Sequence, residues 1–245
     1  MTSELLEVRD LGKTFGGLRA VEALSFNAVR GETIGLIGPN GSGKTTVLNL
    51  LTGAFPADSG SVRFDGRELR GAPAYRICRA GVARTFQLVR PLKGMSVADN
   101  VLVGRIYGAG AEPIDAARNK VPELLALVGL QGREKLPVDA LTYIDQKRVE
   151  LARALAAEPK LLLLDEWLAG LNPTELEAGI GLVRSLKARG LTIILVEHVM
   201  HAVRSLCDRC VVLNAGRKIA EGPPEAVLAD AEVKRAYLGE ETADA

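Results

Sequence analysis

The sequence predicts an α/β protein with a central sheet of mainly parallel strands. Two wholly apolar runs, residues 161–164 and 191–196, are separated by a segment of helical character, residues 173–189. Wholly apolar strands are typical of parallel sheets that are covered on both faces. A third apolar run, residues 33–37, fits another buried strand, and residues 46–51 fit the opening of the helix that follows it.

The flanking segments complete the expected order of elements. Residues 5–10 and 24–29 are typical of strands, and residues 61–66 alternate with the period of a half-exposed strand. These three segments predict an antiparallel sheet near the N-terminus. Residues from about 96 to 157 have helical spacing, and the chain after Asn214 predicts a hairpin followed by two short helices.

A glycine-rich loop with the pattern G-x-x-x-x-G-K-[ST] joins the first buried strand to its helix. Its glycines let the backbone curl so that N–H groups point at phosphate oxygens, and the helix N-terminus adds its positive end. Lys44 brings a cation to the β- and γ-phosphates, and the Thr45 hydroxyl can bind Mg²⁺. The sequence therefore predicts a P-loop NTPase core that binds a nucleoside triphosphate. The loop residues expected to bind it are Gly38, Pro39, Asn40, Gly41, Ser42, Gly43, Lys44, Thr45 and Thr46.

Two carboxylates, Asp165 and Glu166, follow the apolar run at 161–164. The carboxyl end of a parallel strand borders the crevice in which such sheets bind ligands. Asp165 is therefore the expected partner of Mg²⁺, through a bound water. Glu166 is expected to act as general base on the attacking water.

Composition narrows the class of protein further. The net charge of +1 gives no reason to expect a nucleic-acid partner. No apolar run reaches the roughly 18 residues that cross a bilayer, and the N-terminus lacks the pattern of a signal peptide. A cytoplasmic protein is expected. Cys207 and Cys210 form a single C-x-x-C pair, for which core packing is favoured over metal or redox chemistry.

With these motifs, the chain resembles the ATP-binding subunits of ABC transporters over essentially its whole length. Phe15 matches the aromatic residue that stacks on adenine in this family, Gln87 matches the Q-loop glutamine, and His198 matches the switch histidine that contacts the γ-phosphate. The resemblance implies ATP and Mg²⁺ as cofactors. It implies that Glu166, His198 and Gln87 are catalytic and that Thr45, Gln87 and Asp165 surround the metal.

The resemblance also implies a single nucleotide-binding domain over residues 1–245. About residues 1–86 and 158–245 are expected to form the core with its N-terminal antiparallel β subdomain. About residues 87–157 are expected to form an inserted α-helical subdomain that carries the signature loop.

Within the family, the chain is most similar to branched-chain amino acid importers, through residues 81–87, 169–173, 196–200 and 236–239. The similarity implies an ATPase that powers import of branched-chain or related amino acids. It implies a second ATP-binding subunit, two membrane permease subunits and, indirectly, a periplasmic solute-binding protein, at the cytoplasmic face of the inner membrane. The implied D-loop consists of Ala169, Gly170, Leu171 and Asn172.

Two positions depart from the family pattern. Trp167 stands where proline commonly follows the catalytic glutamate, and Ile144 replaces a glycine of the signature L-S-x-G-Q. This loop contacts the ATP bound by the opposite subunit, so a β-branched side chain is expected to crowd it. A heterodimer whose partner carries the glycine is therefore favoured. The signature residues are Leu141, Thr142, Tyr143, Ile144, Asp145 and Gln146.

Three alternatives share part of this pattern. Related transporters for urea, amides or lipopolysaccharide carry the same catalytic motifs. Soluble ABC ATPases that act on ribosomes or in DNA repair usually fuse two such domains or carry long insertions, for which 245 residues leave no room. A weakly hydrolysing regulatory subunit is supported by Ile144 alone, and the intact Glu166 and His198 argue against it.

Overall fold

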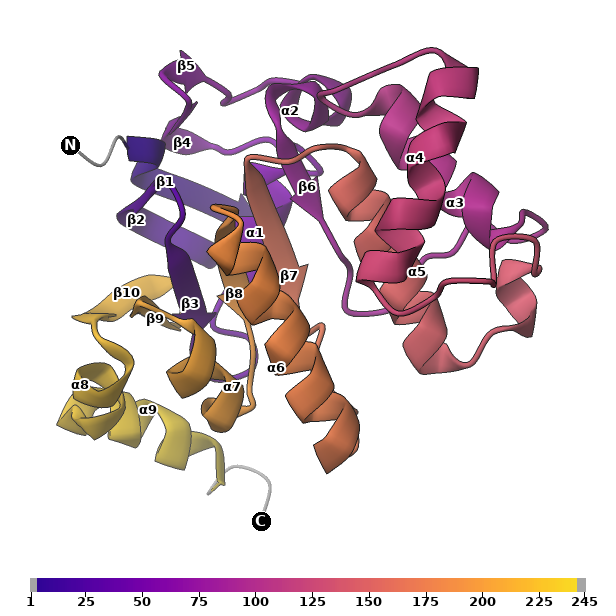
Figure 1. Ribbon diagram of the computed structural model, residues 1–245. Helices are drawn as coiled ribbons and strands as arrows, with labels where there is room; N and C mark the ends of the chain where they lie inside the picture. Colours follow the sequence, from indigo (N-terminus) through magenta and orange to yellow (C-terminus); the bar gives the residue numbers. More distant parts are fainter. Residues whose placement is uncertain (1–3, 242–245) are drawn as a thin grey trace.

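The computed structural model, which describes residues 4–241, contains the predicted mainly parallel sheet (Figure 1). Its six strands have the order β10-β9-β3-β8-β7-β6, and all neighbours are parallel except β10, which runs antiparallel to β9 at one edge. The strands are β3 (Thr33–Ile37), β6 (Val82–Arg84), β7 (Leu161–Asp165), β8 (Thr192–Val196), β9 (Arg209–Asn214) and β10 (Arg217–Gly222).

A second, antiparallel sheet is built from the N-terminal part of the chain, as predicted. Its order is β2-β1-β4-β5. Its strands are β1 (Glu4–Phe15), β2 (Leu18–Val29), β4 (Ser59–Phe64) and β5 (Arg67–Glu68). The first two are longer than predicted because bulges near Asp10 and Ala23, both at positive φ, let the pairing continue where the alternation of side chains breaks.

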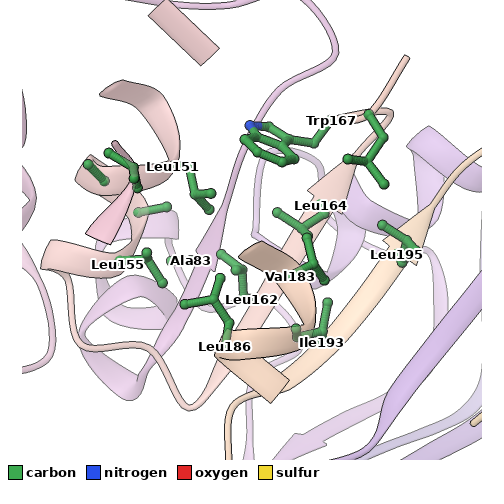
Figure 2. Close-up of a cluster of buried hydrophobic side chains, with 14 of the residues drawn as sticks. Ala83, Leu151, Leu155, Leu162, Leu164, Trp167, Val183, Leu186, Ile193 and Leu195 are labelled. Carbon is green, nitrogen blue, oxygen red and sulfur yellow. The ribbon is translucent and has the colours of Figure 1, made fainter. Parts of the chain in front are cut away.

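The parallel sheet separates two hydrophobic cores. In β7, Leu161 and Leu163 face the core that lies toward the antiparallel sheet and α1, whereas Leu162 and Leu164 face the core beneath the helices. This alternation is the period-two pattern of a strand buried on both faces. Figure 2 shows part of the second core, with Leu162 and Leu164 packed near Val183 and other apolar side chains.

Helices cover the parallel sheet and extend to one side of it. In Figure 1, α3, α4 and α5 stand together at one side of the molecule, and α8 and α9 lie at the opposite end beside β10. Their bounds are α1 (Lys44–Leu51), α2 (Ala74–Ala80), α3 (Val97–Tyr107), α4 (Ile114–Leu127), α5 (Tyr143–Ala156), α6 (Pro173–Ala188), α7 (Met200–Leu206), α8 (Pro224–Ala229) and α9 (Ala231–Glu241), with a 3₁₀ turn at Val138–Ala140. Over residues 4–241, we find no helix that is both long and apolar enough to span a membrane.

The strand order brings four loops of the predicted site to one edge of the sheet. Strands β3, β8, β7 and β6 are consecutive neighbours and run in the same direction, so their carboxyl ends lie side by side. The P-loop follows β3, and His198, Glu166 and Gln87 follow β8, β7 and β6. Residues far apart in the chain therefore converge at this edge.

Candidate active site

The loop between β3 and α1 requires glycine at two positions. Gly38 has a φ of 148°, and a Cβ atom there would lie 2.0 Å from the carbonyl oxygen of Leu213. Gly43 has a φ of 105°, and its Cβ would lie 2.4 Å from the carbonyl oxygen of Ala20. Because both obstacles are backbone atoms, any side chain here would displace the loop. The curled loop lets α1 begin directly at Lys44, with its N-terminus at the loop.

The Lys44 side chain folds back over this loop. Its Nζ atom donates hydrogen bonds to the carbonyl oxygens of Gly38 and Pro39, both at 2.7 Å, and lies 3.5 Å from the Ser42 hydroxyl. The ammonium group is thus held where the phosphates of a nucleotide would meet it. Phosphate oxygens can replace the two carbonyl groups as stronger, charged acceptors.

A pocket of about 610 Å³ lies over the P-loop. It is lined by Phe15, Leu18, Arg19, Ala20, Asn40, Gly41, Ser42, Gly43, Lys44, Thr45, Thr46, Gln87, Glu166 and Ala215. Of Phe15 and the predicted P-loop contacts, only Gly38 and Pro39 are absent from this lining, and those two are buried in the loop itself. His198, expected at the γ-phosphate, is also outside the lining and contacts Glu166, which is in it. Leu18, Arg19, Ala20 and Ala215 were missed, since they come from the start of β2 and from the β9–β10 turn, which carry no phosphate-binding pattern.

Phe15, at the end of β1, presents an aromatic ring at one end of the pocket. The ring is 40% exposed, and its edge-to-face contact with Phe55 has a centroid distance of 5.4 Å. The Nζ atom of Lys13 lies 5.3 Å from the Phe15 centroid. These contacts fix the ring while it remains accessible from the pocket, as stacking on a flat base requires.

Glu166 is the point at which three of the converging loops meet. Its Oε2 atom accepts a hydrogen bond from Gln87 Nε2 at 2.8 Å, and its Oε1 atom lies 3.0 Å from His198 Nε2. The residue has a φ of 49°, in the left-handed region that is uncommon for a residue with a side chain. Its backbone N–H donates to the carbonyl of Val196 at 2.9 Å, which holds this conformation against β8. The carboxylate is thereby directed into the pocket between an amide and an imidazole.

Asp165, the last residue of β7, forms a buried ion pair with Arg84 at the end of β6. The Asp165 Oδ2 atom accepts from Arg84 Nη2 at 2.6 Å, and Arg84 also donates to Asn49 Oδ1 at 2.6 Å. Burial raises the pKa of Asp165, and the hydrogen bond from Arg84 opposes that rise. Arg84 is a site residue that was not predicted from the sequence, since its partner is evident only once β6 and β7 are seen to be neighbours.

The donor set fits a hard divalent cation. The second carboxylate oxygen of Asp165, Oδ1, is buried without a hydrogen-bond partner among the described residues. Such an unsatisfied acceptor can bind a cation or a water molecule that a cation holds. The hydroxyl of Thr45 and the amide of Gln87 both line the pocket and supply the oxygen ligands that Mg²⁺ prefers.

Comparison with known proteins assigns the family. Residues 21–169 match the family model "ABC transporter", and residues 217–243 match "Branched-chain amino acid ATP-binding cassette transporter".

The chain belongs to the ABC transporter family. It is 38% identical to the high-affinity branched-chain amino acid transport ATP-binding protein BraF of Pseudomonas aeruginosa, over 98% of this chain and 100% of BraF. It is also 38% identical to the high-affinity branched-chain amino acid transport ATP-binding protein LivG of Escherichia coli K12, over 98% of this chain and 100% of LivG. A crystal structure of the ADP conformation of MJ1267, an ATP-binding cassette of an ABC transporter, superimposes with a TM-score of 0.87 at 32% identity, over 97% of this chain and 100% of that one. The predicted family, α/β P-loop fold and ATPase activity are confirmed.

The predicted signature residues form the first turn of α5 and the approach to it. Thr142 is the N-cap, and its hydroxyl oxygen accepts from the backbone N–H of Asp145 at 3.3 Å. Asp145 is buried and paired with Arg133 and Arg148, so its carboxylate turns into its own subunit. Thr142 and Tyr143 are exposed, Leu141 is buried, and Gln146 donates to the carbonyl of Leu141 at 3.1 Å.

The Ile144 side chain lies between α5 and α6. With Trp167, Leu171 and Gly179 it lines a cavity of about 190 Å³. The two departures from the family pattern, Ile144 and Trp167, therefore occupy one place in the structure. This proximity could not be predicted from the sequence, because 23 positions separate the two residues.

The predicted D-loop leads into a strongly capped helix. Asn172 is the N-cap of α6 and forms a capping box with Glu175, with hydrogen bonds of 2.9 and 3.0 Å. Such a box fixes the direction in which a helix begins. Gly170 and Asn172 are exposed, and Ala169 and Leu171 are half-buried.

The two cysteines of the C-x-x-C pair are buried against β3. A Cβ atom added to Gly35 would lie 3.0 Å from the Sγ atoms of both Cys207 and Cys210. Both thiols are reduced and serve as small apolar packing groups, as the sequence favoured.

Proposed function

We propose that this chain is the ATP-hydrolysing subunit of an importer for branched-chain or related amino acids, with Glu166 as the base that activates water. The observation that carries the catalytic part is the convergence of Gln87 and His198 on the two carboxylate oxygens of Glu166, at the rim of the P-loop pocket. Relatives named for branched-chain amino acid transport, at 38% identity over their whole length, support the solute class.

Each predicted site residue has a role in this proposal. Phe15 stacks on adenine, and residues 38–46 bind the phosphates with Lys44 as the cation. Thr45 and Gln87 would hold Mg²⁺, and Asp165 would act on it through a bound water. The bound metal would neutralise phosphate charge, and His198 would contact the γ-phosphate. Gln87 and His198 hold the Glu166 carboxylate toward the water.

The proposed assembly contains two ATP-binding subunits and two permease subunits at the cytoplasmic face of the inner membrane, with a periplasmic solute-binding protein as an indirect partner. Residues 87–157 would move as a helical subdomain against a core of residues 1–86 and 158–245. A cavity of about 290 Å³ is lined by Ile77, Phe86 and Tyr107 among others, and Phe86 directly precedes Gln87. Its largely apolar lining fits a short helix from a permease.

Charge reversal at Arg90 tests this placement of the permease. Arg90 is exposed, and its guanidinium carbon lies 4.4 Å from the centroid of Phe86, which borders the cavity. In proteoliposomes that contain the whole transporter, Arg90→Glu should lower ATP-driven uptake of leucine, isoleucine and valine at least ~10-fold. The new carboxylate would either repel acidic groups of the permease or lie in the interface without a partner of opposite charge. The isolated subunit should keep its ATP affinity. Arg184→Glu, at an exposed position of α6, is the control and should transport normally.

Uptake by the Arg90→Glu transporter equal to that of the control would contradict this interface. Uptake of none of the three amino acids by the unsubstituted transporter would contradict the proposed solute class.

Replacing Ile144 with glycine tests whether the two ATP sites of the dimer are unequal. If the isoleucine crowds the nucleotide of the partner subunit, Ile144→Gly should raise ATP turnover about 2- to 10-fold. The rise is expected in a dimer in which the signature of this chain faces an active ATP site of the partner. Turnover and dimer formation are measured for the purified subunit and for the co-expressed pair. Ile114→Gly, at the exposed first position of α4, is the matched control for glycine in a first helical turn. Unchanged turnover and dimer formation in both preparations would remove the case for unequal sites.

A further inference from the structure

A buried lysine of α5, Lys147, holds the backbone of the segment that carries Glu166. Its Nζ atom donates to the carbonyl oxygens of Ala169 at 2.8 Å, Trp167 at 3.1 Å and Glu166 at 3.4 Å. An ammonium group has three N–H donors, so these carbonyls use all of them. The residue is 2% exposed, and burial lowers its pKa. A charge is costly to bury, and three neutral carbonyls in one short segment offset that cost only while the segment keeps its shape.

Trp167 returns a hydrogen bond to the same lysine. Its indole Nε1 donates to the carbonyl oxygen of Lys147 at 3.2 Å, so the two residues are joined in both directions. Figure 2 shows the indole at the edge of the apolar cluster, with its nitrogen on the side turned away from Leu164. A proline at this position would have no side-chain donor. The departure from the family pattern therefore strengthens the link between α5 and the segment after β7.

Glu197 holds the same segment from the opposite direction. Its Oε1 atom accepts from the backbone N–H of Leu168 at 2.7 Å, and Glu197 directly precedes His198. Burial raises the pKa of Glu197 to about 7. Residues 166–169 are thus fixed between α5, which begins at the predicted signature, and the segment after β8 that carries His198.

The first turns of α5 also contact the loop that carries Gln87. The Tyr143 hydroxyl lies 3.5 Å from the carbonyl oxygen of Gln87, and Lys147 Nζ lies 5.4 Å from the centroid of the Tyr143 ring. A shift of the N-terminal turns of α5 would therefore move both Gln87 and Glu166, which border the proposed position of the water. Because Glu166 adopts a left-handed backbone conformation, the direction of its side chain depends on how its carbonyl is held.

We propose that Lys147 is a positioning residue that couples the signature end of α5 to the orientation of Glu166 and, through Ala169, to the D-loop. This inference rests on the proposed role of Glu166 as base. A nucleotide bound to the partner subunit would contact the N-terminus of α5 in this chain. Its effect would pass through Lys147 to Glu166, the proposed base of this chain's own site. Each ATP would then influence hydrolysis of the other.

The test replaces Lys147 with methionine, which keeps the length of the side chain and removes its donors. We expect kcat for ATP to fall about 10- to 100-fold while KM stays within about 3-fold, since the pocket itself is intact. Lys147→Arg, which keeps donors toward the carbonyls, should restore kcat to within about 5-fold of the unsubstituted chain. Lys135→Met, at an exposed position, is the control and should leave both constants unchanged.

A double substitution separates positioning from general destabilisation. If Lys147 acts by orienting the Glu166 carboxylate, adding Lys147→Met to Glu166→Gln should lower single-turnover rates by less than about 2-fold, because the oriented base is already lost. If Lys147→Met does not fold, Trp167→Phe carries the test. It removes the indole donor and reduces the size of a ring that stays aromatic, and it should lower kcat about 3- to 10-fold at unchanged KM.

The possible outcomes distinguish this inference from the proposed function. If Glu166→Gln is inactive while Lys147→Met or Trp167→Phe keeps full kcat, the coupling is wrong and the base assignment stands. Losses that multiply in the double variant would overturn it as well, since they indicate independent effects. Glu166→Gln with full turnover would overturn both the base and the coupling through it.

Discussion

Replacement of Glu166 with glutamine should leave ATP binding intact and slow turnover at least ~10²-fold. Glutamine has nearly the same size, so the pocket and its contacts to Gln87 and His198 keep a hydrogen-bonding side chain in place. What is lost is the capacity to accept a proton from water. The measurement is steady-state phosphate release together with the Kd of a fluorescent ATP analogue.

The chain offers a matched control for this substitution. Glu177 lies 2.7 Å from His201 on the surface, which reproduces the carboxylate–imidazole contact of Glu166 and His198 outside the pocket. Glu177→Gln should therefore hydrolyse ATP normally. Turnover by Glu166→Gln that is close to that of Glu177→Gln would show that another group activates the water.

Replacement of Lys44 with alanine should weaken ATP binding about 10- to 100-fold. This range follows from the roughly 1.5–3 kcal/mol of a hydrogen bond to a charged group, which corresponds to about one to two decades in Kd. Lys44 also holds the carbonyls of Gly38 and Pro39, so its removal loosens the loop that presents the other phosphate contacts. Hydrolysis should fail at ATP concentrations that saturate the unsubstituted chain.

Equilibrium titration of the Lys44→Ala subunit with ATP measures this effect. Lys160→Ala is the control, because Lys160 pairs with Asp65 on the surface and its loss removes a cation of the same kind outside the pocket. An ATP affinity of Lys44→Ala within 2-fold of the control would be incompatible with the proposed phosphate role.

The parts of the fold that the sequence predicted are those whose signals are local. The runs that became β7 and β8 are mostly apolar because both faces are covered. The P-loop pattern directly encodes a backbone path that needs Gly38 and Gly43. Several short elements were missed, namely β5, β6, β9, α2 and α7. Strand β6 has three residues and α2 has seven, too few to show a period.

The residues missed at the site were those whose role depends on a distant partner. Arg84 matters because β6 lies beside β7, which places it against Asp165. Lys147 matters because α5 crosses the segment after β7, and Glu197 because β8 ends beside Leu168. These charged residues were visible in the sequence, but the groups that they bind lie on distant segments, and no motif records those partners.

A structure of the Glu166→Gln subunit bound to Mg²⁺ and ATP tests the central claim most directly. We expect adenine stacked on Phe15 and the phosphates cradled by residues 38–46. We expect Mg²⁺ ligated by Thr45 and Gln87, with Asp165 reached through a water, and the substituted side chain facing a water in line with the γ-phosphate. A γ-phosphate that lies away from position 166 and His198, with the metal bound by other residues, would contradict the account.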